Sequence, residues 1–253
     1  MTGRLFSLMA TVAFSTVVLS AAASASGEAP HWTYEGEEGP EHWATLSGDF
    51  AACGAGMEQS PIDLARNAAF SADVETIDRG WAPFKPAIVN NGHTIQANVP
   101  EGNVTEFGGK AYELLQVHFH SQSEHAIDGN RFPLEAHFVH KADDGSLMVL
   151  VVMLVEGAEN AELAKIWGAM PSFKGEMQGS DTVDLGGLVP KDSKVFRYAG
   201  SLTTPPCSEI VNWTVFEKPV EVSAEQIAAF TRLYPDNARP LQSVNRRMIL
   251  IGD

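Results

Sequence analysis

The chain has 253 residues and a formal net charge of −15, because 32 aspartates and glutamates outnumber 17 lysines and arginines. This length is enough for one large domain or two small ones. An acidic chain without a basic cluster argues against nucleic acid and anionic lipid as partners, while the charge itself says nothing specific about a substrate.

Residues 1–25 have the pattern of a secretory signal peptide. Arg4 gives a positive start, an apolar run extends from Leu5 to Leu19, and Ala23-Ser24-Ala25 has the small residues of a cleavage site. A membrane anchor is the alternative, but the apolar run is shorter than the roughly 20 residues that a span requires. We therefore expect a mature domain over residues 26–253 in a periplasm or secreted, with no membrane insertion of that mature chain.

The rest of the chain reads as one domain with a large sheet. Residues 31 to about 70 are rich in glycine, proline and polar residues, which predicts irregular chain around the core. Strand-like runs follow at residues 87–99, 112–120, 134–141, 147–157, 194–202 and 209–220. Helices are expected at residues 160–170, capped by Asn160, and 223–234, which begins with a Ser223/Gln226 capping box. Short strands in series, without regular βαβ alternation, predict a mainly β (α+β) domain with a largely antiparallel sheet.

The two cysteines are Cys53 and Cys207. In an oxidising compartment an even count favours one disulfide, which here would close a long loop. Two free buried thiols are the alternative if the leader is not a secretion signal. Neither cysteine has a CxxC neighbour, which argues against redox chemistry and against a structural zinc ribbon.

Histidines on two neighbouring runs suggest a metal site. Side chains at positions i and i+2 of a strand point the same way, so Gln116, His118 and His120 share one face. Glu135 and His137 share a face of the following run. If these strands pair as a hairpin across residues 121–132, the three histidines can meet at one point. Three neutral imidazoles suit zinc and leave a fourth position open for water.

The residues two positions before the histidines strengthen this interpretation. A ligating histidine usually donates its other N–H to a carboxylate, an amide or a carbonyl, and Gln116 and Glu135 are suited to accept it. The alternative is a set of hydrogen-bonded sheet histidines, which an HxH pair alone would favour. His140 faces away and is expected to be structural. His125, beside Glu124, can serve the site or satisfy a buried carboxylate.

Six motifs resemble those of one known family: "GPEHW", "QSPID", "NNGH", "QVHFHSQSEH", "EAHFVH" and "YAGSLTTPPC". Together the chain resembles the α-class carbonic anhydrases from about His31 to the C-terminus. The resemblance implies a central twisted, mostly antiparallel sheet of about ten strands with a few peripheral helices. It also implies reversible hydration of carbon dioxide to bicarbonate and a proton, by attack of a zinc-bound hydroxide and transfer of the proton by a histidine.

The resemblance also implies the roles of individual residues. The zinc ligands would be His118, His120 and His137. Gln116 and Glu135 would support two of them, and a backbone carbonyl near Asn245 would hold His120. Thr203 would orient the hydroxide and donate the hydrogen bond of its own hydroxyl to Glu124, while Thr204 lines the substrate side. The apolar pocket would be formed by Val139, Val149, Leu202, Val211 and Trp213.

Proton transfer and scaffolding complete the implied set. His93 matches the proton shuttle, and the waters on its path would be ordered by Tyr34, Asn91 and Gln96. His125 and Tyr198 would form a network behind Glu135, and Cys53 and Cys207 match the disulfide of secreted members. The sequence leaves both a monomer and a homodimer open.

Two other functions compete with this interpretation. A binding module of the same fold that has lost catalysis is one, but here all three histidines, Thr203 and Glu124 are present. A zinc hydrolase that acts mainly on esters is the other. The sequence has neither an HExxH nor a GxSxG motif, which argues against a dedicated protease or serine esterase.

Overall fold

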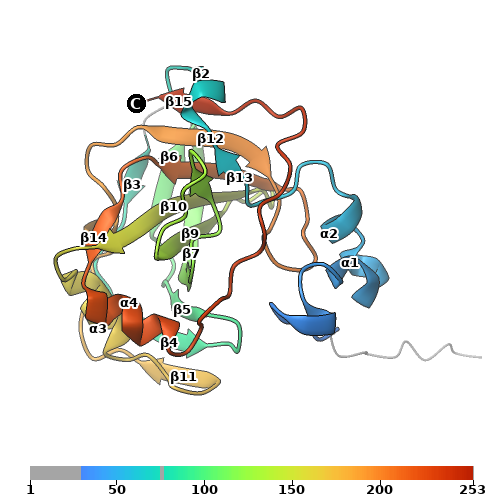
Figure 1. The fold of residues 1–253 in the computed structure, drawn as a ribbon. Helices are drawn as coiled ribbons and strands as arrows, with labels where there is room; N and C mark the ends of the chain where they lie inside the picture. Colours follow the sequence, from blue (N-terminus) through green and yellow to red (C-terminus); the bar gives the residue numbers. More distant parts are fainter. Residues whose placement is uncertain (1–29, 75–76, 253) are drawn as a thin grey trace, which may run out of the picture. The chain divides into compact units, whose positions relative to one another are not determined.

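A computed structural model of the protein describes residues 30–74 and 77–252. The predicted signal peptide, residues 1–25, lies outside these residues and stays a prediction. One compact unit, His31–Asp253, carries the sheet and the helices (Figure 1). Among the helices described, none is long and apolar enough to cross a membrane.

A mixed, mostly antiparallel sheet of thirteen strands forms this unit, in the main order β11-β4-β5-β7-β9-β10-β13-β12-β15-β2. Their bounds are β2 (Phe70–Ser71), β4 (Ala87–Asn90), β5 (Ile95–Asn98), β7 (Lys110–His120), β9 (Leu134–Lys141), β10 (Leu147–Glu156), β11 (Gly175–Gln178), β12 (Val195–Gly200), β13 (Val211–Phe216) and β15 (Leu250–Gly252). Off this path lie β3 (Asp78–Gly80), β6 (Val104–Phe107) and β14 (Val220–Val222), and a separate pair is formed by β1 (Asp63–Leu64) and β8 (Ala126–Ile127). The prediction of a large, mostly antiparallel sheet is confirmed.

Both predicted helices are present and lie side by side (Figure 1). In α3 (Ala161–Trp167), the side chain of Asn160 accepts hydrogen bonds from the first-turn backbone N–H groups. In α4 (Ala224–Thr231), Ser223 and Gln226 form the predicted capping box. The two helices contact each other through Trp167 and Phe230, whose rings stack at 5.6 Å.

The segment before the sheet is less irregular than its composition predicts. It contains two short helices, α1 (Trp43–Leu46) and α2 (Ala52–Ala55), and three 3-10 turns, η1 (Gly36–Glu38), η2 (Gly48–Phe50) and η3 (Arg66–Ala68). A further 3-10 turn, η4 (Leu185–Leu188), lies between β11 and β12. Trp43 is fully buried and contacts the cluster around the disulfide. The buried side chain of Trp43 thus packs this segment against the disulfide, although the segment has no periodic hydrophobic pattern.

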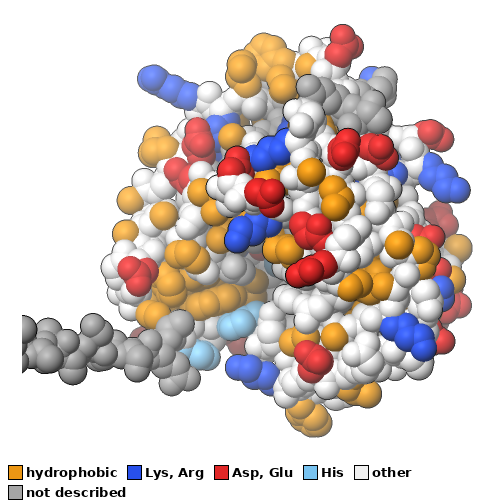
Figure 2. All heavy atoms as spheres, turned by 180° about the vertical axis from the view of Figure 1, so that it is seen from behind, with side chains coloured by type: hydrophobic (Ala, Val, Ile, Leu, Met, Phe, Trp, Pro, Cys, Tyr) orange, Lys and Arg blue, Asp and Glu red, His pale blue; other side chains and the backbone are white. Residues whose placement is uncertain are grey.

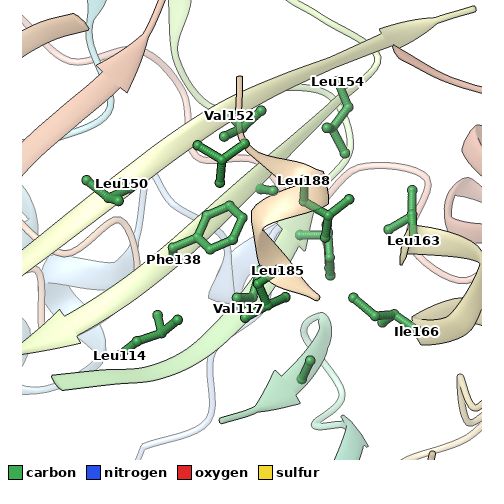
Figure 3. Packing of buried hydrophobic residues seen from close by; sticks show 14 of the residues in the cluster. Leu114, Val117, Phe138, Leu150, Val152, Leu154, Leu163, Ile166, Leu185 and Leu188 are labelled. Carbon is green, nitrogen blue, oxygen red and sulfur yellow. The ribbon is translucent and has the colours of Figure 1, made fainter. Parts of the chain in front are cut away.

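The main hydrophobic core covers one face of the central strands. Val117 of β7, Phe138 of β9 and Leu150 of β10 pack there against η4 and α3 (Figure 3). Strand β10 is apolar along nearly its whole length because a second cluster, with Val149 and Val151, covers its other face. The core thus occupies one face of β7 and β9 and leaves the other face for His118, His120 and His137.

Candidate metal centre

Strands β7 and β9 pair antiparallel and bring the three predicted ligands together. His118 lies opposite His137, and His120 lies opposite Glu135. The pairing slips by one residue between Leu114 and Gln116, a β-bulge that leaves Leu115 without an opposite residue in β9. Ligand atoms of His118, His120 and His137 all lie within 4.8 Å of one another.

In each of the three ligand rings, one nitrogen already has a hydrogen-bond partner in the protein. Nδ1 of His118 donates to Oε1 of Gln116 at 2.9 Å, and Nε2 of His137 donates to Oε1 of Glu135. Nδ1 of His120 donates to the backbone carbonyl of Asn237 at 2.8 Å. These bonds orient the rings and leave the second nitrogen of each for a metal.

The expected partner of His120 near Asn245 is wrong. The side chain of Asn245 instead donates to the carbonyl of Met57, and the carbonyl that holds His120 belongs to Asn237. The Asn237 side chain is also bound on both sides, to the backbone of Ser121, Phe119 and His93. Sequence reasoning missed Asn237 because a backbone carbonyl leaves no trace in residue type.

Two buried atoms beside the histidines lack hydrogen-bond partners among the described residues. They are Nε2 of His120 and Oε2 of Glu124, which lie 3.5 Å apart. Leaving a buried polar atom unpaired costs about 1–3 kcal/mol, so both atoms indicate a ligand at this point. Three imidazoles with one open position are the ligand set of catalytic zinc, and the residues present fit that ion.

The charges of the site suit metal binding. Burial lowers the pKa of His118 well below its ordinary value and also lowers the pKa of His137. Both rings are therefore neutral, the form that ligates metals. Burial alone would raise the pKa of Glu135, but His125 and His137 hold it well below its ordinary value. Glu135 is therefore an ionised acceptor behind the ligands.

His125 lies behind Glu135. Its Nδ1 donates to Oε1 of Glu135 at 2.8 Å, and its Nε2 lies 2.6 Å from the hydroxyl of Tyr198. That hydroxyl lies 3.0 Å from Oγ of Ser60. His125, Glu135 and His137 come close enough to resemble a second metal site, but their hydrogen bonds to one another already account for the arrangement.

Glu124 and Thr203 are both buried, at 0% and 5% exposure. Oε1 of Glu124 accepts from the backbone N–H of Arg239 at 2.9 Å. The predicted bond from Thr203 to Glu124 is not among the hydrogen bonds of the described residues. Oε2 of Glu124, the unpaired atom, remains available as an acceptor.

A cavity of about 160 Å³ opens in front of the ligands. It is lined by Trp32, Tyr34, Asn91, His93, Thr94, Gln96, Gln116, His118, His120 and Thr204. Figure 2 shows histidine side chains beside a hollow in the surface, with hydrophobic side chains near it. The residues predicted for proton transfer thus share one cavity with two of the three ligands.

The contacts of His93 add one residue that the sequence did not indicate. Its ring stacks on Trp32 with centroids 3.9 Å apart, and burial lowers its pKa. Oδ1 of Asn91 accepts from the backbone N–H groups of His93 and Thr94, so Asn91 fixes the turn that carries the ring. Gln96 donates to Asn98 at 2.6 Å.

The predicted apolar residues gather on the sheet beside His137. The register places Val149 of β10 between Val139 of β9 and Trp213 of β13, and the second core cluster also contains Val211 and Leu202. The ring of Trp213 lies 5.0 Å from that of His137. An apolar surface therefore adjoins the histidine cluster.

The predicted disulfide is confirmed. Cys53 of α2 is bonded to Cys207, 154 residues later in the loop that follows β12. The backbone N–H of Cys207 donates to the carbonyl of Thr204 at 2.9 Å. The disulfide thus ties the loop of Thr203 and Thr204 to the N-terminal segment.

Comparison with known proteins gives consistent matches. The family model of the eukaryotic-type carbonic anhydrases matches residues 38–252. The carbonic anhydrase of Pectobacterium atrosepticum is 41% identical over 237 residues, covering 92% of this chain and 96% of that protein. The carbonic anhydrase of Pectobacterium carotovorum is 42% identical over 253 residues, with 99% and 100% covered. The structure of the α-carbonic anhydrase of Thermovibrio ammonificans with the inhibitor sulfanilamide has a TM-score of 0.86 and 41% identity, and covers 88% of this chain and 100% of that chain.

Proposed function

The chain belongs to the eukaryotic-type, or α-class, carbonic anhydrases, and from this premise we propose which of its residues perform the reaction. The reaction is the reversible hydration of carbon dioxide to bicarbonate and a proton (EC 4.2.1.1), and the family uses zinc. The observation that carries the assignment is the convergence of His118, His120 and His137, each with one ring nitrogen fixed and one left over.

These three histidines would hold the zinc ion. When bound, zinc acts as a Lewis acid that makes a water molecule acidic enough to serve as a nucleophile near neutral pH. Gln116, the Asn237 carbonyl and Glu135 keep the rings in a ligating orientation. Their bonds also select the ring nitrogen that carries the proton.

Thr203 and Glu124 would aim the nucleophile. Oε2 of Glu124 would accept a hydrogen bond from the Thr203 hydroxyl, so that the threonine oxygen is left to accept a hydrogen bond from the nucleophile. Carbon dioxide has no charge to bind, and an apolar surface beside the histidines suits it. We assign that surface to Val139, Val149, Leu202, Val211 and Trp213, with Thr204 on the substrate side.

Each turnover leaves one proton that must reach solvent, and we assign its transfer to His93. A histidine titrates near neutral pH and can therefore accept and release this proton. Waters in the cavity would connect His93 with the reaction centre, along a path lined by Tyr34, Asn91 and Gln96. The shared cavity supports this assignment.

We further propose that the protein works outside the cytoplasm, in a periplasm or secreted, after removal of residues 1–25. The disulfide between Cys53 and Cys207 supports this, because such bonds persist in oxidising compartments. Assembly as a homodimer is a separate proposal, which light scattering on the purified protein tests directly.

A stopped-flow assay of carbon dioxide hydration tests the function. Activity is expected in the purified protein, is expected to disappear after zinc is removed with a chelator, and should return when zinc is added back. A binding module would give no activity under any of these conditions. A dedicated zinc esterase would hydrolyse activated esters faster than it hydrates carbon dioxide.

A further inference from the structure

We propose that Arg239 is a positioning residue for the reaction: its anchored side chain fixes the backbone N–H that holds Glu124 in place. The inference rests on the role proposed above for Glu124. Sequence reasoning did not single out Arg239, since the segment around it has no motif that indicates function.

The side chain of Arg239 is buried, with 1% of it exposed, and bound to separate segments of the chain. Nη1 donates to the carbonyl of Ser60 at 2.8 Å and to Oε1 of Gln59 at 2.9 Å. Nη2 donates to the carbonyl of Cys53 at 2.9 Å. A planar guanidinium can satisfy these three acceptors at once, which the single ammonium of a lysine cannot do in the same geometry.

The backbone of the same residue contacts the reaction centre. Its N–H donates to Oε1 of Glu124 at 2.9 Å, which leaves Oε2 as the oxygen without a partner. A carboxylate fixed through one oxygen cannot rotate freely, so its other oxygen keeps a defined direction. Arg239 therefore determines where Glu124 presents the acceptor that Thr203 is proposed to use.

A second connection leads to the loop that carries Thr203. Gln59 accepts from Arg239 and donates through Nε2 to the carbonyl of Cys207 at 3.0 Å. Cys207 in turn donates to the carbonyl of Thr204. One buried cation is thus linked both to Glu124 and to the loop that carries Thr203.

Charge gives a further reason for an arginine at this point. The three acceptors of its side chain are neutral oxygens, so burial lowers the pKa of Arg239 to about 10, while the negative charge of Glu124 opposes that shift. The cation therefore stays ionised at neutral pH.

A double-mutant cycle tests this inference. Arg239→Met is made in the wild type and in Glu124→Gln, and kcat/KM for carbon dioxide hydration is measured per bound zinc. Because contacting residues couple, we expect kcat/KM to fall about tenfold in the wild-type background and less than about twofold in Glu124→Gln. A crystal structure of Arg239→Met should show the Glu124 carboxylate rotated.

Arg247→Met is the matched control. Arg247 also donates to several backbone carbonyls, including those of Gln59 and Ala199, but it has no hydrogen bond to Glu124. Its loss should lower the melting temperature and leave kcat/KM per zinc unchanged. If Arg239→Met does not fold, Arg239→Lys, which keeps the charge, is measured in the same cycle.

The outcomes separate the two proposals. An unchanged kcat/KM in the Arg239 variants, or an equal fall in both backgrounds, would overturn the positioning role of Arg239 alone. If Glu124→Gln by itself leaves kcat/KM unchanged, the role of Glu124 fails, and the role of Arg239 fails with it.

Discussion

His118 and His137 lie directly opposite each other in the β7–β9 ladder, with ring centroids 5.0 Å apart. A shift of one residue in this register would turn one strand's histidines toward the core. The metal centre therefore depends on strand pairing as much as on the ligands themselves.

Replacing a ligand should remove the metal and leave the fold. We expect His137→Ala to lose zinc and hydration activity, because two imidazoles bind zinc much more weakly than three. Metal analysis after dialysis measures the loss, and circular dichroism checks the fold. His31→Ala is the control, since His31 is exposed and bonded to Glu38 at the surface. Full zinc content in His137→Ala would contradict the ligand assignment.

Removing the Thr203 hydroxyl should impair the reaction without releasing zinc. We expect Thr203→Ala to lower kcat/KM on the order of 100-fold, the size seen when a preorganised hydrogen bond at a reacting atom is lost. Thr203→Ser retains the hydroxyl and should keep most of the activity. Equal kinetics in the alanine and serine variants would argue against the orienting role.

In dilute buffer, turnover should depend on proton transfer through His93. We expect His93→Ala to lower kcat in dilute buffer and imidazole to restore it, because a soluble base can replace the missing proton acceptor. Burial, together with the charges of His31 and Lys174, lowers the pKa of His93 below 6.5. The ring thus stays unprotonated, and able to accept a proton, at lower pH than a free histidine.

That shift is itself measurable. Titration of the His93 ring signal by NMR should give a pKa below 6.5, and Trp32→Ala should move it upward because the substitution exposes the ring. An unchanged pKa in Trp32→Ala would mean that burial under the indole is not its cause.

The buried His140 predicts part of the acid sensitivity of the fold. It is fully buried on the core side of β9, where Nδ1 donates to the carbonyl of Phe138, and burial lowers its pKa from 6.5 to about 4. Between pH 6.5 and pH 4, His140 binds a proton in the unfolded chain but not in the native chain. The free energy of unfolding therefore falls as the pH drops toward 4. The loss from this group is about 3 kcal/mol across that window.

Denaturant unfolding at several pH values checks the effect. His140→Gln cannot titrate, so its free energy of unfolding should fall less steeply than that of the wild type between pH 6.5 and pH 4. Parallel curves for the two proteins would rule out His140 as a contributor.

Loss of the disulfide should lower stability by about 4–5 kcal/mol, because the cysteines are 154 residues apart and the bond restricts a long loop of the unfolded chain. Unfolding of the double variant Cys53→Ser/Cys207→Ser by guanidinium measures this loss. A reducing agent should destabilise the wild type and leave the variant unaffected.

Much of this architecture could be predicted from local pattern. Strand β9 spans residues 134–141 as expected, and the capping box of α4 forms as its sequence indicates. The bulge at Leu115 was not predicted. It changes the alternation within β7, so that Leu114 packs in the core although Gln116, two positions later, joins the histidines. The two-residue alternation of side chains along a strand does not by itself reveal such a bulge.

The misplaced partner of His120 has a different cause. A carbonyl oxygen is present at every residue, so which one meets His120 depends on how the chain is routed and not on side-chain type. The same holds for the N–H of Arg239 that contacts Glu124. Backbone contacts between residues more than a hundred positions apart can be identified only from the three-dimensional fold.

The separation of these residues along the chain also determines the order in which they are synthesised. Asn237 follows His120 by 117 positions, and Arg239 follows Glu124 by 115. At a synthesis rate of about 5–20 residues per second, the ligand leaves the ribosome's catalytic centre roughly 6–23 s before its carbonyl partner exists. During that interval Gln116 and Glu135 can already orient His118 and His137, but His120 and Glu124 still lack their backbone partners. The metal centre can therefore be completed only after residues 237–239 have been synthesised.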